Sequence, residues 1–285
     1  MEFILNKVQE NIKEILETEK SNYNKESLKT IFSLIDLTTL KPSDNASVIE
    51  GMCNKVNNLE KHHKGMPQVA AICVYPSMVE EVESRLKIKG VNIAAVSAGF
   101  PASQTFLSIK IAETELAIAK GADEIDIVIS LGKFLEGNYE FVANEIKLIK
   151  QSMHDKHLKV ILESGLMPNL DDVYKASVIA MNSGADFIKT STGKENPPAT
   201  LEAIYVMCKA IKEHYEKTGV KIGLKPAGGI STSEEVFKYY AVVKSILGEK
   251  WLNNKLFRIG ASRLANDLIK EISKFENTNI TADYF

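Results

Sequence analysis

The stretch that decides the fold is Ala185–Lys194, which reads ADFIKTSTGK. A short apolar run ends in a lysine, and hydroxyl side chains, a glycine and a second lysine follow it. Successive side chains of a strand point to opposite faces, so Phe187 and Lys189 share one face and Ile188 takes the other. An ammonium group on a buried face is costly unless it has a partner or a chemical task. A lone lysine at a strand end would more simply reach solvent, so its interpretation depends on what accompanies it.

Two other strand-like stretches carry charged residues in a similar place. Lys221–Gly229 reads KIGLKPAGG, and Lys225 stands in it as Lys189 does in its own strand. Glu124–Ile129 reads EIDIVI, in which Asp126 takes the inward face and three isoleucines take the outward one. The sequence therefore predicts two lysines and one carboxylate on the inward faces of three strands.

Composition limits the class of protein. The chain has 285 residues, of which 45% are hydrophobic and 25% charged, as expected for a globular protein with a large core. A net charge of −2 gives no basic surface for nucleic acid or an anionic membrane. Three cysteines without a CxxC pair favour a reducing compartment, and neither a signal peptide nor an 18-residue apolar run is present. We expect a cytoplasmic protein.

Helix-like and strand-like patterns alternate along the whole chain. Strands are predicted at 31–39, 69–76, 92–101, 124–129, 158–165, 185–191, 221–229 and 257–262. Helices are predicted at 2–20, from 42 to about 60, from 77 onward, and at 105–120, 139–153, 171–182, 200–217, 233–247 and 263–275. Eight such units without a linker indicate a closed (β/α)8 TIM barrel. The alternative is an open doubly wound sheet, which would require a glycine-rich loop after the first strand.

The same patterns predict one domain. Residues 1–285 are expected to form a single barrel, with residues 1–28 as an N-terminal helical extension and residues 276–285 as a C-terminal tail. Within it, Gly121–Asp126 (GADEID) aligns with Gly184–Lys189 (GADFIK), two βα units apart. If these units are equivalent, Asp126 and Lys189 lie at similar height in the barrel, because alternate strands share a layer.

Two inward lysines beside a carboxylate suit imine chemistry. A neutral amine condenses with a carbonyl, and the iminium then accepts electrons while a C–C bond forms or breaks. A second ammonium at about 4 Å disfavours protonation by about 4 kcal/mol at an effective dielectric of 20, or roughly three pKa units. The structural alternative is a Lys–Asp–Lys ion-pair cluster that only holds the barrel together.

Phosphate binding is indicated by loops after the last strands. Gly228 and Gly229 follow the seventh strand, and Gly260-Ala261-Ser262 follows the eighth. Such loops often hold phosphate in these barrels. The sixth loop can add donors from Ser191, Thr192, Gly193 and Lys194. Glycine is also the usual turn residue, so only the combination of adjacent loops is informative.

The chain resembles the deoxyribose-phosphate aldolase family from Leu34 to Ala265. The matching stretches are IDLTTLKP, AICVYPSMV, ELAIAKGADEIDIVI, LKVILESG, ADFIKTSTGK, GLKPAGGI and FRIGAS. The resemblance implies a class I aldolase, without metal or other cofactor, that reversibly cleaves 2-deoxy-D-ribose 5-phosphate into acetaldehyde and D-glyceraldehyde 3-phosphate in deoxyribonucleotide catabolism. Similar enzymes are often dimers, so a homodimer is an expectation to test.

The resemblance also implies roles for individual residues. Lys189 would be the Schiff-base lysine, Lys225 the cation that tunes it, and Asp126 a proton relay. Asp36, Thr38 and Cys73 match positions that line the substrate's path in the family.

The phosphate end departs from the family. Family members often have arginine where this chain has Ser231, and a small residue where it has Arg263. We therefore expect the amides of Gly229, Ile230 and Ser262 to bind phosphate, with Lys194 and in one alternative Arg263 supplying charge.

Other interpretations stay open. A sugar-phosphate sensor would keep the glycine loops without needing inward lysines, and another Schiff-base aldolase or a transaldolase would keep the lysines. The five histidines fall in helices or in loops that lead into strands, and we interpret them as solvated: His62, His63, His154, His157 and His214. The spacing HDKH at 154–157 lies opposite the strand ends that carry the lysines.

Overall fold

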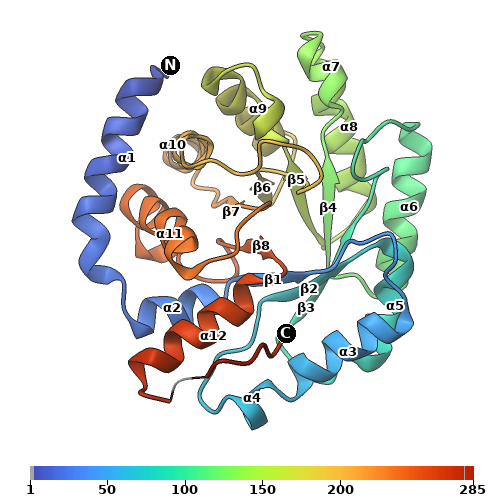
Figure 1. The fold of residues 1–285 in the computed structure, drawn as a ribbon. Coiled ribbons are helices and arrows are strands. Elements are labelled where there is room, and N and C mark those ends of the chain that lie inside the picture. The colour runs from blue at the N-terminus through green and yellow to red at the C-terminus, as the bar shows by residue number, and fades with distance from the viewer. Residues whose placement is uncertain (1–2, 279) are drawn as a thin grey trace.

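The computed structural model describes residues 3–278 and 280–285. Eight parallel strands form one sheet in the order β7-β6-β5-β4-β3-β2-β1-β8. Their bounds are Ile35–Thr38 (β1), Ala71–Val74 (β2), Asn92–Val96 (β3), Glu124–Val128 (β4), His157–Ile161 (β5), Phe187–Lys189 (β6), Gly223–Lys225 (β7) and Ile259–Ala261 (β8). Parallel bridges from Leu224 to Phe257 and from Ala227 to Gly260 join the two ends of the sheet. The predicted (β/α)8 barrel is confirmed, and the open-sheet alternative is wrong (Figure 1).

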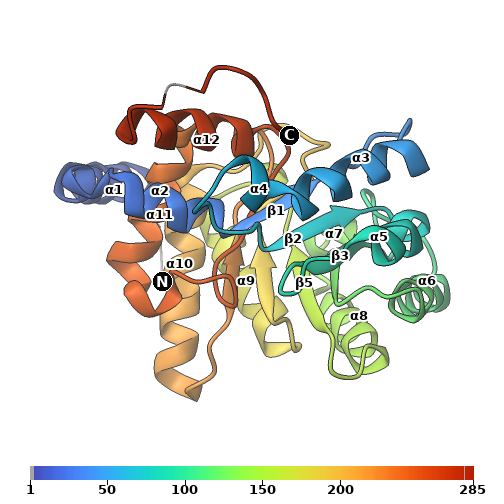
Figure 2. The same ribbon diagram turned by 90° about the horizontal axis from the view of Figure 1, so that it is seen from below.

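Helices surround the barrel, and α1 lies outside the ring against α10 and α11 (Figures 1 and 2). The α-helices are Leu5–Glu19 (α1), Lys25–Phe32 (α2), Ala46–Asn57 (α3), Leu59–His62 (α4), Val79–Arg85 (α5), Leu107–Ala119 (α6), Leu131–Leu135 (α7), Tyr139–Ser152 (α8), Leu170–Asn182 (α9), Leu201–Thr218 (α10), Ser233–Leu247 (α11) and Leu264–Phe275 (α12). Short 3-10 helices occupy Lys20–Asn22, Pro76–Met78, Ser164–Leu166 and Glu249–Trp251. None of the described helices combines the length and apolar character needed to cross a bilayer.

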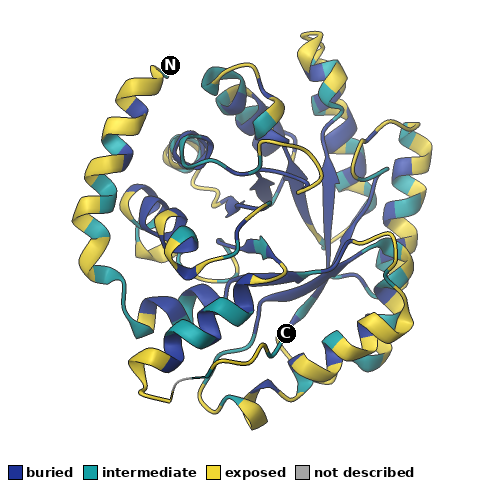
Figure 3. Cartoon of the chain, viewed as in Figure 1, coloured by how far each residue is buried: buried dark blue, intermediate teal, exposed yellow. Residues whose placement is uncertain are grey.

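The core lies mainly between the strands and the helices. The strands are almost wholly buried, whereas the outer faces of the helices are exposed (Figure 3). Outward-facing strand residues such as Ile125, Val160 and Leu224 belong to this large apolar cluster. A second, smaller cluster inside the barrel contains Leu40, Ala71, Cys73, Ala94 and Val96. The inner faces of β4 to β7 also carry buried polar side chains, with the Phe187 ring beside Lys159 and Arg258.

The first predicted strand is partly wrong. Ile31 and Phe32 end helix α2 instead of opening a strand over 31–39, and β1 begins only at Ile35. The helix starts with a capping box, because Asn24 and Ser27 each accept a hydrogen bond from the other's amide, at 3.0 and 3.1 Å. It buries Leu28, Ile31 and Phe32 at helical spacing. A helical stripe and the end of a strand look alike over three residues, so the pattern misplaced this boundary.

The other strands are shorter than predicted, because their last residues form the loops above the barrel. Of the predicted strand 221–229, for example, only Gly223–Lys225 is regular, while Gly228 and Gly229 have positive φ angles of 90° and 75°. The leading helix begins at Leu5 instead of residue 2, and residues 1–2 lie outside the described part. The small helices α4 and α7 were not predicted.

The C-terminal tail packs outside the barrel. After α12 the chain turns back, and the amides of Tyr284 and Phe285 donate to the side chain of Asn266 at 2.9 and 2.7 Å. The Tyr284 hydroxyl donates to the Lys55 carbonyl in α3 at 2.7 Å. The tail therefore covers the gap between α12 and α3, where the C-terminus is marked in Figure 1.

One glycine sets the spacing between β6 and β7. Gly223 pairs with Phe187, and a Cβ at position 223 would lie 2.2 Å from the Phe187 ring. We predict that Gly223→Ala lowers the free energy of unfolding by about 1–3 kcal/mol through overpacking, measured by urea denaturation. Gly51→Ala is the control, because no atom lies within 4 Å of a Cβ there. It should be neutral or stabilise helix α3 by up to about 1 kcal/mol. Equal stability of Gly223→Ala and the unaltered protein would contradict the prediction.

Candidate active site

Lys189, Lys225 and Asp126 meet in the barrel lumen. Lys189 and Lys225 end neighbouring strands in register, and Asp126 comes from β4. Both Nζ atoms lie 2.8 Å from Asp126 Oδ2. All three side chains are buried. Lys189 donates to Asp126, so both side chains point into the barrel, as the alternation along their strands predicts.

The two lysines have opposite pKa shifts. Burial is the main cause that lowers the pKa of Lys189, and the Lys225 ammonium lowers it further against the opposing effect of Asp126. Burial also disfavours the charged form of Lys225, but Asp126 and Asp36 outweigh it and hold its pKa well above the ordinary value. One amine is thus made easier to deprotonate beside another that stays charged.

Asp36 completes this group from β1. Its Oδ2 lies 2.5 Å from Lys225 Nζ, and its Oδ1 accepts from Arg258 at 2.7 Å. Burial alone would raise the pKa of each carboxyl, but neighbouring cations hold both Asp36 and Asp126 below their ordinary range. Both are therefore carboxylates at neutral pH.

The sequence interpretation missed three charged residues deeper in the lumen. Lys159 donates to Glu124 at 2.5 Å and to Asp126 at 3.2 Å, and Arg258 donates to Glu124 at 2.6 Å. These three residues, which we call the floor cluster, are buried. The signal was present, because Glu124 stands two residues before Asp126 and so shares its face. Lys159 and Arg258 each interrupt an apolar strand-like run, as Lys189 does.

Thr38 and Cys73 lie side by side at the ends of β1 and β2, where they pair in register. Cys73 is buried, and burial raises the pKa of its thiol, so it is a neutral group at the lumen wall. Thr38 is half-buried, and its hydroxyl donates to the Asp36 carbonyl at 2.7 Å. Both predicted positions therefore adjoin the charged group.

Hydrogen bonds from Glu163 and within the loop fix the conformation of the loop after β6. The Thr192 amide donates to the buried Glu163 carboxylate at 3.1 Å, and the Thr192 hydroxyl accepts from the Lys194 amide at 3.0 Å. Lys194 Nζ reaches across to the Leu40 carbonyl at 2.5 Å, after β1. The side chain of Ser191 is buried in this loop. The Thr192 and Lys194 amides are thus occupied, which leaves the Lys194 ammonium as the cation that this loop offers.

The loops after β6 and β7 approach closely, since a Cβ on Gly193 would lie 3.6 Å from Gly228 Cα. In the described part of the chain, the amides of Gly229, Ile230 and Ser262 donate no hydrogen bond, so they can serve an anion. A Cβ on Gly260 would lie 2.9 Å from Ala227 Cβ, which explains the glycine.

The two residues that depart from the family resemblance follow the last two strands, Ser231 after β7 and Arg263 after β8. The Ser231 amide donates to Glu235 at 3.2 Å, and Ser231 is half-buried. Arg263 is exposed at the residue that precedes α12, and no carboxylate pairs with it among the described residues. The structure leaves Arg263 available as a cation.

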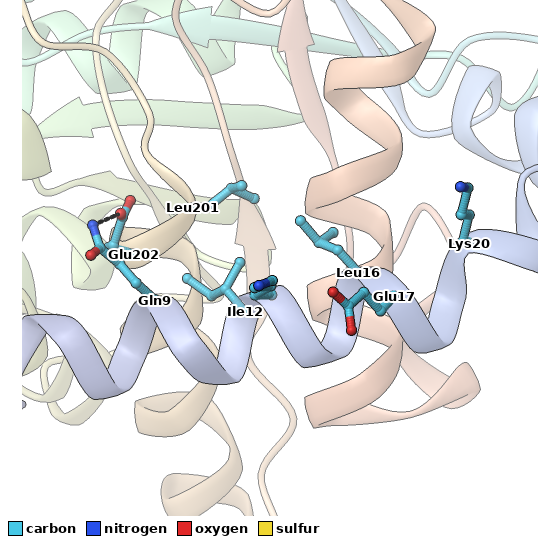
Figure 4. A pocket seen from close by; sticks show the side chains of 8 residues that line it. Gln9, Ile12, Leu16, Glu17, Lys20, Leu201 and Glu202 are labelled. Atoms are coloured by element: carbon cyan, nitrogen blue, oxygen red, sulfur yellow. Dashed lines mark hydrogen bonds between the residues drawn. The ribbon is translucent and has the colours of Figure 1, made fainter.

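Outside the lumen, the described residues form a surface hollow but no metal-binding cluster. Within residues 3–278 and 280–285, no group of three or more His, Cys, Asp or Glu side chains is arranged to hold a metal ion. A hollow of about 340 Å³ lies on the outer surface between α1 and the start of α10, with Ile12, Leu16 and Leu201 in its lining (Figure 4). No predicted site residue lines it.

The fold places the chain among the (β/α)8 barrels, and two buried lysines end neighbouring strands in its lumen. A family model described as DeoC/LacD family aldolase matches residues 30–263. The deoxyribose-phosphate aldolase of Homo sapiens is 43% identical over 266 residues, which cover 90% of this chain and 83% of that protein. The chain belongs to the DeoC/LacD family of aldolases, as its motifs predict.

Solved structures agree with this assignment. The aldolase QR15 is 29% identical, with a TM-score of 0.68 over 87% of this chain and 96% of that one. The deoxyribose phosphate aldolase from Aeropyrum pernix, described as tetrameric, is 22% identical with a TM-score of 0.67 over 92% and 97%. At that identity, the second comparison shows the fold alone.

Proposed function

We propose that this chain is a class I aldolase that reversibly cleaves 2-deoxy-D-ribose 5-phosphate into acetaldehyde and D-glyceraldehyde 3-phosphate. The observation that carries the proposal is the pair of buried lysines on one carboxylate, with the pKa of Lys189 lowered and that of Lys225 raised. The substrate is inferred from relatives named deoxyribose-phosphate aldolase that match most of the chain.

Lys189 acts as the nucleophile in this mechanism. Its neutral amine attacks C1 of the open-chain sugar, and uptake of one proton with loss of one water gives an iminium. A base removes the proton of the C3 hydroxyl, the C2–C3 bond breaks, and its electron pair forms an enamine at C1 and C2. Glyceraldehyde 3-phosphate leaves, C2 takes up a proton, and one water hydrolyses the iminium to acetaldehyde and the free amine. The water released at the start is consumed at the end, and the proton taken up at the start is released.

Lys225 and Asp126 support these steps without forming covalent bonds. Lys225 keeps its charge, because two carboxylates hold it, and so disfavours a second ammonium at Lys189. Asp126 Oδ2 accepts from both amines in the free protein. When Lys189 becomes an iminium, Oδ2 can turn to a water that carries the proton between C2, the C3 hydroxyl and solvent.

The phosphate end is assigned to the loops after β6, β7 and β8. The unoccupied amides of Gly229, Ile230 and Ser262 supply donors, and Gly193, Gly228 and Gly260 let the backbone come close. Lys194 and Arg263 supply charge in place of the arginine that Ser231 replaces. Thr38, Cys73 and Asp36 flank the sugar on the β1–β2 side.

Two other functions remain as outcomes of the tests. A sugar-phosphate sensor would bind at the same loops but would form no imine, and an aldolase with another donor would form an imine without preferring acetaldehyde. We further expect a cytoplasmic enzyme that forms a homodimer, acts in deoxyribonucleotide catabolism, needs no cofactor and binds neither nucleic acid nor membrane.

The first prediction concerns the nucleophile. Acetaldehyde with borohydride should leave one reduced ethyl group on the protein, measured by intact mass, and peptide mapping should place it on Lys189. Lys189→Arg should abolish the adduct, because a guanidinium forms no imine at neutral pH. An adduct that persists in Lys189→Arg would refute the assignment, and its absence from the unaltered protein would favour a sensor.

The second prediction concerns the tuning cation. Lys225→Leu should lower kcat at pH 7 roughly 100-fold, since Lys225 and Lys189 bind the same oxygen of Asp126 and losing a charge so near raises the pKa of Lys189 by about two units. Part of the loss should disappear as pH rises, because more Lys189 becomes neutral. Lys225→Arg keeps the charge and should retain the original pH–rate profile. A Lys225→Leu profile of unchanged shape would show that Lys225 does not set the ionisation of the amine.

The third prediction concerns the phosphate. If Arg263 binds it, Arg263→Ala should raise KM for the phosphorylated sugar about tenfold or more, as for the loss of a charge-assisted bond. The effect on unphosphorylated deoxyribose should be slight. Lys270→Ala is the control, because Lys270 lies further along α12 and pairs with Asp283. Equal losses on both sugars would mean that Arg263 is structural, and no loss would leave the phosphate to the amides and Lys194.

A further inference from the structure

The barrel lumen contains an unequal number of positive and negative groups. Within the described residues, the ion pairs of the lumen join three carboxylates, Asp36, Glu124 and Asp126, to four cations, Lys159, Lys189, Lys225 and Arg258. Every one of these side chains is at most 4% exposed. A charge that lacks a counter-charge is most costly in such an environment. The four cations exceed the three carboxylates by one. The cation that the carboxylates do not balance is therefore the one that loses its charge most easily.

The floor cluster has one net positive charge, and its two cations also contact the aspartates above it. Arg258 binds Glu124 Oε1 at 2.6 Å and Asp36 Oδ1 at 2.7 Å. Lys159 binds Glu124 Oε2 at 2.5 Å and Asp126 Oδ1 at 3.2 Å. Two cations thus share Glu124, and each also binds the Oδ1 atom of one aspartate above, while Lys159 lies 3.9 Å from Asp36 Oδ2 as well.

The Oδ2 atoms of the same two aspartates face the lysines at the strand ends. Lys225 takes both of them, at 2.5 Å from Asp36 and 2.8 Å from Asp126. Lys189 contacts Asp126 Oδ2 alone, at 2.8 Å. Asp36 and Asp126 are therefore already balanced by Lys225 and by the surplus charge of the floor cluster. Lys189 is the cation that remains.

We propose that the floor cluster of Lys159, Glu124 and Arg258 consists of positioning residues that make Lys189 the amine that gives up its proton. The cluster does so by pinning the Oδ1 atoms of Asp36 and Asp126 and supplying them with one net positive charge. The proton of Lys189 leaves to solvent at the open end of the barrel. This inference deepens the proposed function and rests on it for the use of the neutral amine.

The groups around Lys189 come from every strand that carries an ionisable side chain inward. They are Asp36 from β1, Cys73 from β2, Glu124 and Asp126 from β4, Lys159 from β5, Lys225 from β7, and Arg258 just before β8. β3 carries no ionisable residue. Cys73 stays neutral because burial raises the pKa of its thiol. His157 is half-exposed below the floor, 4.0 Å from Glu124, and adds charge only when protonated.

The alternative hypothesis is that the floor cluster only stabilises the barrel, and it predicts a different result. Replacing its residues would then change stability while leaving the ionisation of Lys189 as it was. Charge balance instead predicts shifts of opposite sign for the loss of a cation and the loss of a carboxylate. The two explanations are separated by titrating Lys189 in variants of each kind.

The experiment follows the ε-carbon signal of Lys189 by NMR in 13C-lysine-labelled protein across pH. The signal is assigned by its loss in Lys189→Arg. Lys159→Met should raise the titration midpoint of Lys189 by about one pKa unit or more, because a buried charge that binds the other oxygen of the same carboxylate no longer repels the ammonium. Glu124→Gln should lower the midpoint, and the double variant should lie between the two. Lys159→Arg keeps the charge and should leave the midpoint unchanged.

Shifts of the same sign in Lys159→Met and Glu124→Gln, or no shift in either, would overturn the proposal. If Lys159→Met does not fold, the Glu124→Gln shift measured against Lys159→Arg decides alone, a downward shift supporting charge balance and no shift refuting it. The titration needs neither substrate nor turnover. An unaltered protein without aldolase activity would therefore refute the proposed function and still give a readable answer here.

Discussion

The lumen depends on one carboxylate. Asp126 accepts hydrogen bonds from three lysines on three other strands, Lys159 at Oδ1 and Lys189 and Lys225 at Oδ2. A buried carboxylate would ordinarily be neutralised by protonation, but three adjacent cations hold its pKa well below the ordinary range. The same contacts bring the lysines within reach of one another. The geometry of the site and its electrostatics therefore have a single origin.

The strands can hold this group because their two faces have different tasks. In most barrels of this kind, layers of branched apolar side chains fill the interior. Here the outward face of each strand packs against the helices, as Ile125, Leu158 and Leu224 show. That apolar layer encloses the barrel independently of the lumen. The inward faces of β1 and of β4 to β7 carry the charged groups, with the Phe187 ring beside Lys159 and Arg258, while β2 and β3 line the lumen with small apolar residues.

Much of this arrangement follows from alternation along the sequence. A period of two places Asp126, Lys189 and Lys225 inward, and the repeated βα units predict the ring that brings them together. The same rule applied to Glu124 and Lys159 would have found most of the floor cluster. Alternation cannot predict the register between strands. In that register Asp126 pairs with Lys159, and Lys189 pairs with Lys225. Local pattern also failed at Ile31 and Phe32, where a capped helix precedes the strand.

The two halves of the site are built differently, and this limits how each can change. The amines stand on strands whose register and packing fix them within the barrel, so a change there disturbs the whole charge network. The proposed phosphate contacts come from loop amides after β7 and β8 and from Lys194 and Arg263, which belong to exposed segments. Loops tolerate substitution better than strands do. An arginine at position 263 in place of the one that the family resemblance implies at position 231 is the kind of exchange that this division permits, because charge at the mouth can move between loops while the amine stays in place.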